Sequence, residues 1–260
     1  MTQLVVVGGG KMGEALLGGL LASGWAPPDE VVVVELDAAR RAALLERFPG
    51  IRCSAELVAA DGAIVAVKPQ GVAEVSGALG RLGVRRILSI AAGVRLATLE
   101  AAVPDGTAVV RAMPNTPALV GMGAAAIAGG AAATDDDLVW AEQILGAVGT
   151  VVRVSEEQID MVTGLSGSGP AYVFLIAEAL IDAGVLVGLP RDVASALTIQ
   201  TLRGSAELLA QGTPPAEARA NVTSPGGTTA AGVRALEAGG VRASLIDAVV
   251  AAVTRAKEMG

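Results

Sequence analysis

The feature that most constrains the fold is the stretch VVVGGGKMG, which lies between an expected strand and an expected helix near the start of the chain. Gly8, Gly10 and Gly13 have the spacing of a dinucleotide-binding turn. The first glycine permits a tight bend, the second lets the backbone approach a pyrophosphate, and the third permits close packing of helix on strand. The strand–turn–helix setting favours a nucleotide site over a turn of purely structural role.

The first half of the sequence alternates short β-branched runs with helical stretches, which is typical of a parallel sheet with crossover helices. Continuous valine runs predict strands buried on both faces. The expected strands are Leu4–Val7, Val31–Val34, Ala63–Val67, Arg86–Ile90, Ala108–Arg111, Ala124–Ala128 and Val151–Val154. The expected helices are Lys11–Ala22, Ala38–Phe48, Val72–Leu82, Leu96–Ala102 and one that begins at Thr134.

The second half changes to long alanine- and leucine-rich segments broken by glycine and proline. We therefore expect an α/β doubly wound domain over residues 1–154 and an all-helical domain over residues 155–260. Its expected helices are Gln158–Leu186, Arg191–Gln211, Pro215–Asn221, Thr229–Glu237 and Arg242–Lys257. They carry few charges, which favours an oligomer that buries extra helix surface over a monomeric alanine-rich bundle.

Charge and composition exclude several classes of function. The net charge of −7 repels nucleic acid and anionic membranes, so a small-molecule partner is expected. The sequence has no histidine and a single cysteine, Cys53, which excludes a Cys/His metal site and a histidine-dependent triad. Residues 112–134 are uncharged, but prolines and glycines interrupt them, so strand and loop are favoured over a membrane span. The N-terminus has no signal-peptide pattern, and the cytoplasm is the expected compartment.

Three loops follow expected strands, at the sheet edge where doubly wound folds bind ligands. They are AVKP at 66–69, AAG at 91–93 and MPNTP at 113–117. Each is also compatible with an ordinary strand end. Glu35 follows the second strand at the position where an acidic residue accepts hydrogen bonds from the adenosine ribose.

Several motifs in order make the chain similar to one family. They are GGGKMG, AVKP, AAG, RAMPNTP, VTGLSGSGPAY and NVTSPGGTTAAGVRALE, between Gly8 and Glu237, and the last two are the most specific. The chain resembles Δ1-pyrroline-5-carboxylate reductases, which make proline by reducing a cyclic imine with NAD(P)H. The resemblance implies an N-terminal Rossmann-like domain and a helical domain that interlocks with a partner subunit, giving at least a dimer and often a ring of dimers.

The resemblance, taken with the glycine turn and the strand-end loops, gives the expected site residues. The expected cofactor contacts are Gly8, Gly10, Lys11, Met12, Gly13, Glu35, Ala66, Val67, Lys68, Pro69, Ala91, Gly93, Asn115 and Asn221. The expected substrate contacts are Glu156, Ser224, Gly227, Thr228 and Thr229, with Thr163 and Thr229 as candidate catalytic hydroxyls.

The turn from Ser224 to Gly227 raises the question of what it holds, because no positive charge precedes Arg234. Its backbone N–H groups, two threonine hydroxyls and the positive end of the next helix dipole suit a carboxylate. The alternative is a plain helix cap made by Ser224 or Thr228. The resemblance favours binding.

Hydride transfer to an imine carbon needs alignment and a protonated C=N bond, and no nucleophile. Without histidine, the proton comes from solvent, from a hydroxyl such as that of Thr163, or with a substrate that arrives as the iminium. One rival is a β-hydroxyacid dehydrogenase, which relies on an interdomain lysine; none lies between Gly164 and Arg191. The other rival is a catalytically silent dinucleotide-binding scaffold.

Glu35 and Asp37 stand where relatives often carry smaller polar or basic residues, and their charge opposes a 2′-phosphate. We therefore expect NADH to be used at least as well as NADPH. The alternative is that Arg40 or Arg41, at the start of the next helix, binds that phosphate.

Overall fold

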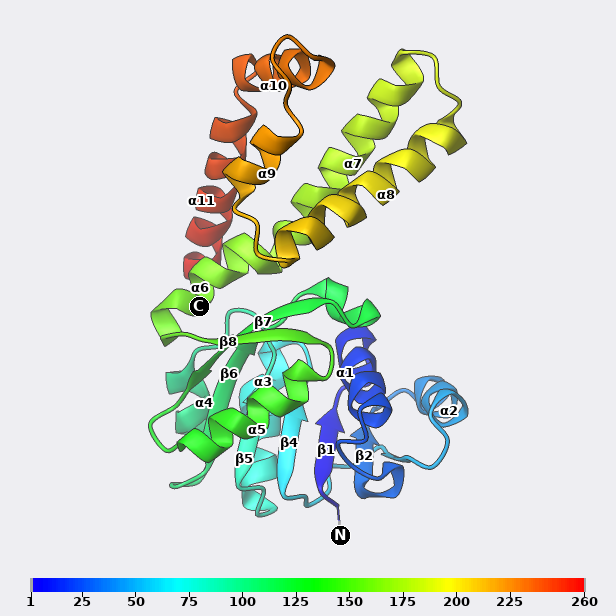
Figure 1. Ribbon diagram of the computed structural model, residues 1–260. Helices are drawn as coiled ribbons and strands as arrows, with labels where there is room; N and C mark the ends of the chain where they lie inside the picture. Colours follow the sequence, from blue (N-terminus) through cyan, green and yellow to red (C-terminus); the bar gives the residue numbers. More distant parts are fainter. Residues whose placement is uncertain (1, 260) are drawn as a thin grey trace. The chain divides into compact units, whose positions relative to one another are not determined.

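The computed structural model describes residues 2–259, and the first half of this range forms a mostly parallel sheet (Figure 1). Its eight strands are ordered β3-β2-β1-β4-β5-β6-β7-β8, so the order reverses between β1 and β4. The strands are β1 (Leu4–Val7), β2 (Val31–Val34), β3 (Arg52–Ser54), β4 (Gly62–Val65), β5 (Arg86–Ser89), β6 (Ala108–Met113), β7 (Gly123–Gly129) and β8 (Gly149–Arg153). Neighbouring strands are parallel except β6 and β7. A reversal of strand order is where folds of this kind bind their ligands.

Helices cover both faces of this sheet. They are α1 (Lys11–Ala22), α2 (Ala38–Arg47), α3 (Pro69–Arg81), α4 (Leu96–Ala102), α5 (Asp135–Gly146) and α6 (Glu156–Val162), with short 3₁₀ turns η1 (Pro28–Glu30) and η2 (Thr116–Val120). Buried side chains of α1, α2 and α5 form one core with alternate strand residues such as Leu4 and Val6. Those of α3, α4 and α6 form a second core with Val5 and Val7. Because successive strand residues point to opposite faces, the valine runs supply both cores.

The predicted strands are confirmed with small shifts at their ends, and one strand was missed. β3 has only three residues, and its sequence Arg-Cys-Ser lacks the apolar run that identified the others. It is the edge strand of the sheet, and its one neighbouring strand is β2. β7 runs antiparallel to β6, so the alternating pattern of the first half does not continue to the end of the sheet.

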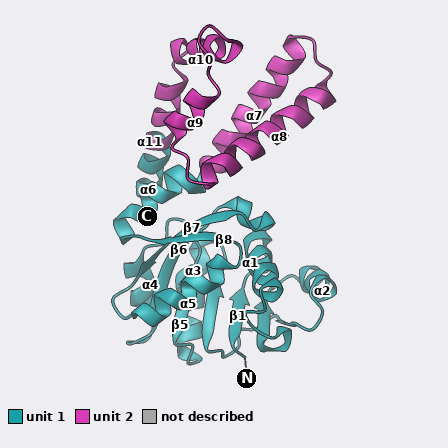
Figure 2. Cartoon of the chain, viewed as in Figure 1, with its two compact units in different colours: residues 1–168, 251–260 teal, residues 169–250 magenta. Residues whose placement is uncertain are grey.

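The chain divides into two compact units (Figure 2). The first contains the sheet domain up to Ser168 together with the end of the chain after Val250. The second unit contains α7 (Gly169–Leu186), α8 (Arg191–Ala210), α9 (Pro215–Asn221), α10 (Thr228–Ala238) and the greater part of α11 (Val241–Met259). Where α7 meets α8, a Cβ added to Gly184 would lie 2.8 Å from the Cβ of Ala194, which shows how closely the two helices pack.

The long helix expected over Gln158–Leu186 is interrupted. After α6, residues Thr163–Gly167 form a π-helical turn η3, in which the N–H of Ser168 donates to the carbonyl of Thr163 at 2.8 Å. Single π turns inside helices occur frequently at functional sites. The turn holds two of the glycines of the VTGLSGSGPAY motif.

The run from residue 156 to residue 186 is long and apolar enough to cross a membrane, by length and composition alone. None of its most apolar window is buried within the chain, and Phe174 and Leu175 are more than half exposed. One such helix is weak evidence for a membrane, and a helix covered by a second protein chain has the same composition.

Candidate active site

The glycine turn has the geometry that its spacing predicts. Gly8 has φ +106°, a value that side chains other than glycine rarely adopt, and a Cβ there would lie 2.5 Å from the carbonyl oxygen of Ala66. A Cβ on Gly13 would overlap the carbonyl oxygen of Gly8, so glycine is needed where α1 packs against the end of β1. The tight bend and the close helix–strand packing are therefore confirmed.

Gly10 differs from the neighbouring glycines because no contact among the described residues requires a glycine there. No atom of residues 2–259 lies within 4 Å of a Cβ built on it, and its φ of −67° suits any residue. Gly10 is the N-cap of α1, and among the described residues no side chain caps this end of the helix. Open space next to uncapped N–H groups at a helix start fits an anionic group such as a pyrophosphate.

A cavity of about 530 Å³ lies at the carboxyl ends of β1, β2 and β4. It brings together six of the expected cofactor residues, namely Gly8, Gly10, Glu35, Ala66, Val67 and Lys68. Apolar side chains such as Leu57 and Val75 complete the lining. An apolar slot with a few polar groups, at the point where strand order reverses, is the usual form of a nucleotide site.

Glu35 points its carboxylate at the backbone of the neighbouring loops. One oxygen accepts a hydrogen bond from the N–H of Gly9 at 2.9 Å, and the other accepts one from Asp37 at 3.1 Å. A carboxylate oxygen accepts more than one hydrogen bond, so Glu35 retains capacity for a ribose hydroxyl. Arg41 donates to the carbonyls of Glu35 and Leu36 at 2.7 and 2.8 Å, which holds its guanidinium at the end of β2.

The remaining expected cofactor residues of the first unit do not line this cavity. Lys11, Met12 and Pro69 occupy first turns, of α1 and α3 respectively. Ala91 and Gly93 follow β5; Ala91 is buried, and Gly93 lies beside Met259 at the end of α11. Asn115 is buried, and its side chain links two other segments. It donates to the carbonyl of Ser166 at 3.0 Å and accepts from the N–H of Ala124 at 2.8 Å.

Glu156 belongs to a partly buried ion cluster in the first unit. Its carboxylate accepts from the N–H of Leu96 at 2.5 Å and from Arg111 at 3.3 Å. Arg111 also donates to Asp160 at 3.0 Å, and its side chain is only 3% exposed. These bonds fasten α6 to β6 and to the start of α4. Sequence reasoning missed Arg111 and Asp160, because no local pattern separates a buried arginine from a solvated one.

Thr163 lies at the junction of α6 and the π-helical turn. Its hydroxyl donates to the carbonyl of Ile159 at 2.8 Å. A hydroxyl has one proton to donate, so in this arrangement Thr163 can accept a hydrogen bond from a ligand and has no free proton to give.

In the second unit, the Ser224–Gly227 turn leads into α10 with Gly227 as its N-cap. The N–H of Gly227 donates to the carbonyl of Ser224 at 3.1 Å, and Gly226 has φ +72°. No side chain of the described residues caps this helix, so neither Ser224 nor Thr228 acts as the plain cap that was the alternative. The first-turn N–H groups of α10 are available to an anion.

A cavity of about 270 Å³ opens beside this turn, lined by Gly226, Gly227, Ala230, Ala231 and Arg234. Sequence reasoning assigned the anion to neutral donors at the helix start and gave Arg234 no role. Its spacing of seven residues from Gly227, which brings it to the same helix face, was the signal that could have found it. The expected cofactor residue Asn221 is exposed at the end of α9.

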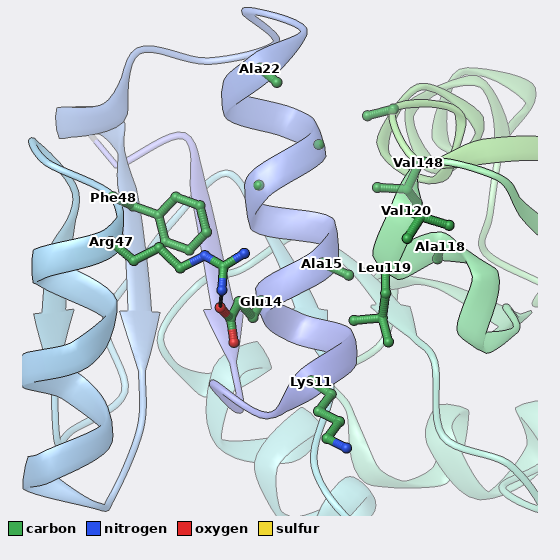
Figure 3. A pocket seen from close by; sticks show the side chains of 14 residues that line it. Lys11, Glu14, Ala15, Ala22, Arg47, Phe48, Ala118, Leu119, Val120 and Val148 are labelled. Carbon is green, nitrogen blue, oxygen red and sulfur yellow. Dashed lines mark ion pairs between the residues drawn. The ribbon is translucent and has the colours of Figure 1, made fainter. Parts of the chain in front are cut away.

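A second large cavity, of about 540 Å³, lies along the outer side of α1 (Figure 3). Arg47 and Phe48 lie on one side of the helix, and Leu119 and Val120 on the other. Lys11 is the one expected cofactor residue in its lining.

Comparison with known proteins places these features in a family. A family model described as pyrroline-5-carboxylate reductase dimerisation matches residues 156–259, and one described as NADP oxidoreductase coenzyme F420-dependent matches residues 3–93. A pyrroline-5-carboxylate reductase of Synechocystis is 46% identical over 265 residues, which cover 99% of this chain and 98% of the relative. The chain belongs to the pyrroline-5-carboxylate reductase family. An Arabidopsis thaliana member is 42% identical, with 97% of this chain and 94% of the relative covered.

Solved structures of pyrroline-5-carboxylate reductases share the whole architecture. The structure from Coxiella burnetii has a TM-score of 0.93 and 35% identity, and covers 100% of this chain and 98% of that one. The Plasmodium falciparum structure, which has NADP bound, has a TM-score of 0.85 and 29% identity with the same coverage. The fold and the family resemblance expected from the motifs are thus confirmed.

Proposed function

We propose that this chain reduces 1-pyrroline-5-carboxylate to L-proline with NAD(P)H, and that its substrate carboxylate binds at the start of α10. The observation that carries the proposal is identity of 46% with a pyrroline-5-carboxylate reductase over 99% of the chain. The open space beside Gly10 at the start of α1 and the adjoining cavity of about 530 Å³ fit a dinucleotide. When bound, the reduced nicotinamide supplies the hydride.

The chain's own residues bind and orient. The N-terminus of α1 and the N–H groups after Gly10 hold the pyrophosphate, while Glu35 accepts from the adenosine ribose. Lys68, exposed at the N-cap of α3, lies at the mouth of the same cavity. Alignment of two reactants in this way accounts for a large part of a hydride-transfer rate.

The substrate carboxylate is held by the N–H groups and hydroxyls of Thr228 and Thr229 at the uncapped start of α10. Arg234 lines the adjacent cavity and adds a positive charge to the same helix face. The Thr163 hydroxyl donates its hydrogen bond to the carbonyl of Ile159, so it can act toward a ligand only as an acceptor. The iminium proton therefore arrives with the substrate or from solvent.

The helical domain assembles the protein into at least a dimer. Residues 156–259 match the family's dimerisation model, and large apolar side chains on α7, α8 and α11 are exposed within one chain. A second subunit covers this surface, and a ring of dimers is the assembly that we infer. The single cysteine leaves no internal disulfide to maintain, which suits the cytoplasm. Size-exclusion chromatography with light scattering should show a dimer or a multiple of it; a strict monomer would contradict this assembly.

The activity is tested by following NADH and NADPH oxidation with the cyclic imine and, separately, NAD(P)⁺ reduction with 3-hydroxy acids. The proposal expects turnover with the imine alone. Turnover of 3-hydroxy acids without imine reduction would favour a β-hydroxyacid dehydrogenase. Nucleotide binding without any turnover would favour a silent scaffold.

A further inference from the structure

Gly9, the middle glycine of the GGG turn, is held by side chains from a distant part of the sequence. It is buried, and its two backbone polar groups bond to Glu35, just after β2, and to Arg40, in the first turn of α2. Its N–H donates to the Glu35 carboxylate at 2.9 Å, and its carbonyl accepts from Nε of Arg40 at 2.6 Å. A buried peptide group needs such partners, and here two charged side chains provide them.

The contact is steric as well as polar. A Cβ on Gly9 would lie 2.7 Å from a methyl carbon of Leu44 and 3.2 Å from a carboxylate oxygen of Glu35. The turn between β1 and α1 therefore packs directly against Glu35, at the end of β2, and against α2. Glycine at this position lets the two segments approach.

Arg40 also reaches the first turn of α1. Its Nη2 pairs with the carboxylate of Glu14, a side chain that is 14% exposed. The other oxygen of Glu14 pairs with Arg47 at 2.7 Å (Figure 3). Arg40 thus bridges the glycine turn and α1, whereas Arg47 contacts the same carboxylate from the solvent side, with 68% of its side chain exposed.

Planarity of the peptide bond gives these contacts a consequence for binding. The carbonyl of Gly9 and the N–H of Gly10 belong to one planar unit and point in opposite directions. A hydrogen bond that fixes the Gly9 carbonyl therefore also fixes the direction of the Gly10 N–H. Glycine-rich backbone rotates freely without such a restraint, so a fixed direction lowers the ordering cost of binding an anion.

We propose that Glu35 and Arg40 form a clamp on Gly9 that orients the turn toward the cofactor's pyrophosphate. Arg40 is then a positioning residue for the pyrophosphate and not the reader of a 2′-phosphate. The inference deepens the proposed function and rests on the dinucleotide site described above.

Two nucleotide fragments separate these roles in the full-length protein. ADP carries a diphosphate and no 2′-phosphate, whereas adenosine 2′-monophosphate carries the 2′-phosphate and no diphosphate. Calorimetry with both is done on the wild type, Arg40→Met and the matched control Arg47→Met, which removes the same kind of charge from the same Glu14 carboxylate without touching Gly9. Thermal unfolding of each variant reports whether it is folded.

The clamp predicts that Arg40→Met weakens ADP binding about tenfold, because the Gly10 N–H loses its fixed direction and with it one hydrogen bond to the charged pyrophosphate. Binding of adenosine 2′-monophosphate should stay within about twofold. Arg47→Met should leave both affinities unchanged. If Arg40→Met does not fold, Arg40→Lys serves, because one ammonium cannot reproduce the planar fork; ADP should still weaken selectively.

Selective loss of adenosine 2′-monophosphate would show that Arg40 reads the 2′-phosphate and would overturn the clamp. Unchanged ADP binding, or equal loss of both fragments, would also overturn it. A wild-type protein that binds neither fragment would contradict the dinucleotide site itself and, with it, the clamp.

Discussion

Gly10→Ala separates cofactor binding from folding, because the structure gives the new methyl group room in the protein and none in the proposed complex. Within the part of the chain that the structure describes, no atom lies within 4 Å of that Cβ, and the backbone at φ −67° and ψ −178° is open to alanine. Replacing glycine by alanine reduces the conformational freedom of the unfolded chain, which stabilises the folded protein by about 0.4–1 kcal/mol. Loss of glycine at an N-cap costs about as much. The two offset, so the unfolding free energy should change by less than about 1 kcal/mol.

The methyl group occupies the space in which a pyrophosphate would approach the N–H groups of α1. Displacement that breaks one or two hydrogen bonds to a charged group, at about 1.5–3 kcal/mol each, weakens NADH binding at least about tenfold. Fluorescence titration with NADH and thermal unfolding measure both quantities. Gly18→Ala, the same change elsewhere on α1, is the control and should bind NADH normally. An unchanged NADH Kd in folded Gly10→Ala would refute the assignment of this turn to the cofactor.

Three further outcomes follow from the described contacts. Thr229→Val should raise the imine KM about tenfold or more and leave the NADH Kd unchanged, because it removes a hydrogen bond to the substrate carboxylate that contributes about 1.5–3 kcal/mol. The control Thr229→Ser should retain the wild-type KM. A change confined to the NADH Kd would refute the carboxylate site. Glu35→Ser should weaken the binding of both cofactors, because the hydrogen bond to Gly9 is lost. It should also raise the ratio of kcat/KM for NADPH over NADH, because a negative charge no longer repels the 2′-phosphate. An unchanged ratio would show that Glu35 does not set the cofactor preference. Burial raises the pKa of the Cys53 thiol, and the nearby charge of Arg41 only partly opposes this shift. Less thiolate therefore forms at neutral pH, and iodoacetamide should react with Cys53 more slowly than with a cysteine peptide. An equal reaction rate would contradict the raised pKa.

The parts of the fold that sequence predicted are those with a local signal. β1 and β2 are runs of valine or leucine buried on both faces, and Gly8 and Gly13 are fixed by the bend and the packing of adjacent segments. β3 escaped because its three residues carry no apolar pattern, and its pairing with β2 decides its conformation.

Contacts between distant residues were out of reach for the same reason. Gly9 occupies an unspecified position in the glycine motif, and its partners lie 26 and 31 residues away. Arg40 was considered for a 2′-phosphate because its charge is visible in the sequence, whereas its bond to the Gly9 carbonyl is visible only in three dimensions. The partly buried cluster around Arg111 likewise depends on α6 meeting β6.

The central claim is that this chain delivers a hydride from reduced nicotinamide to the imine carbon of 1-pyrroline-5-carboxylate. The most direct measurement uses NADH carrying deuterium at the transferable position, with mass spectrometry and NMR of the amino acid formed. The account predicts L-proline with one deuterium on the ring carbon next to nitrogen that does not carry the carboxylate, in step with NADH oxidised. Oxidation of NADH without labelled proline, or no oxidation with the imine present, would contradict it.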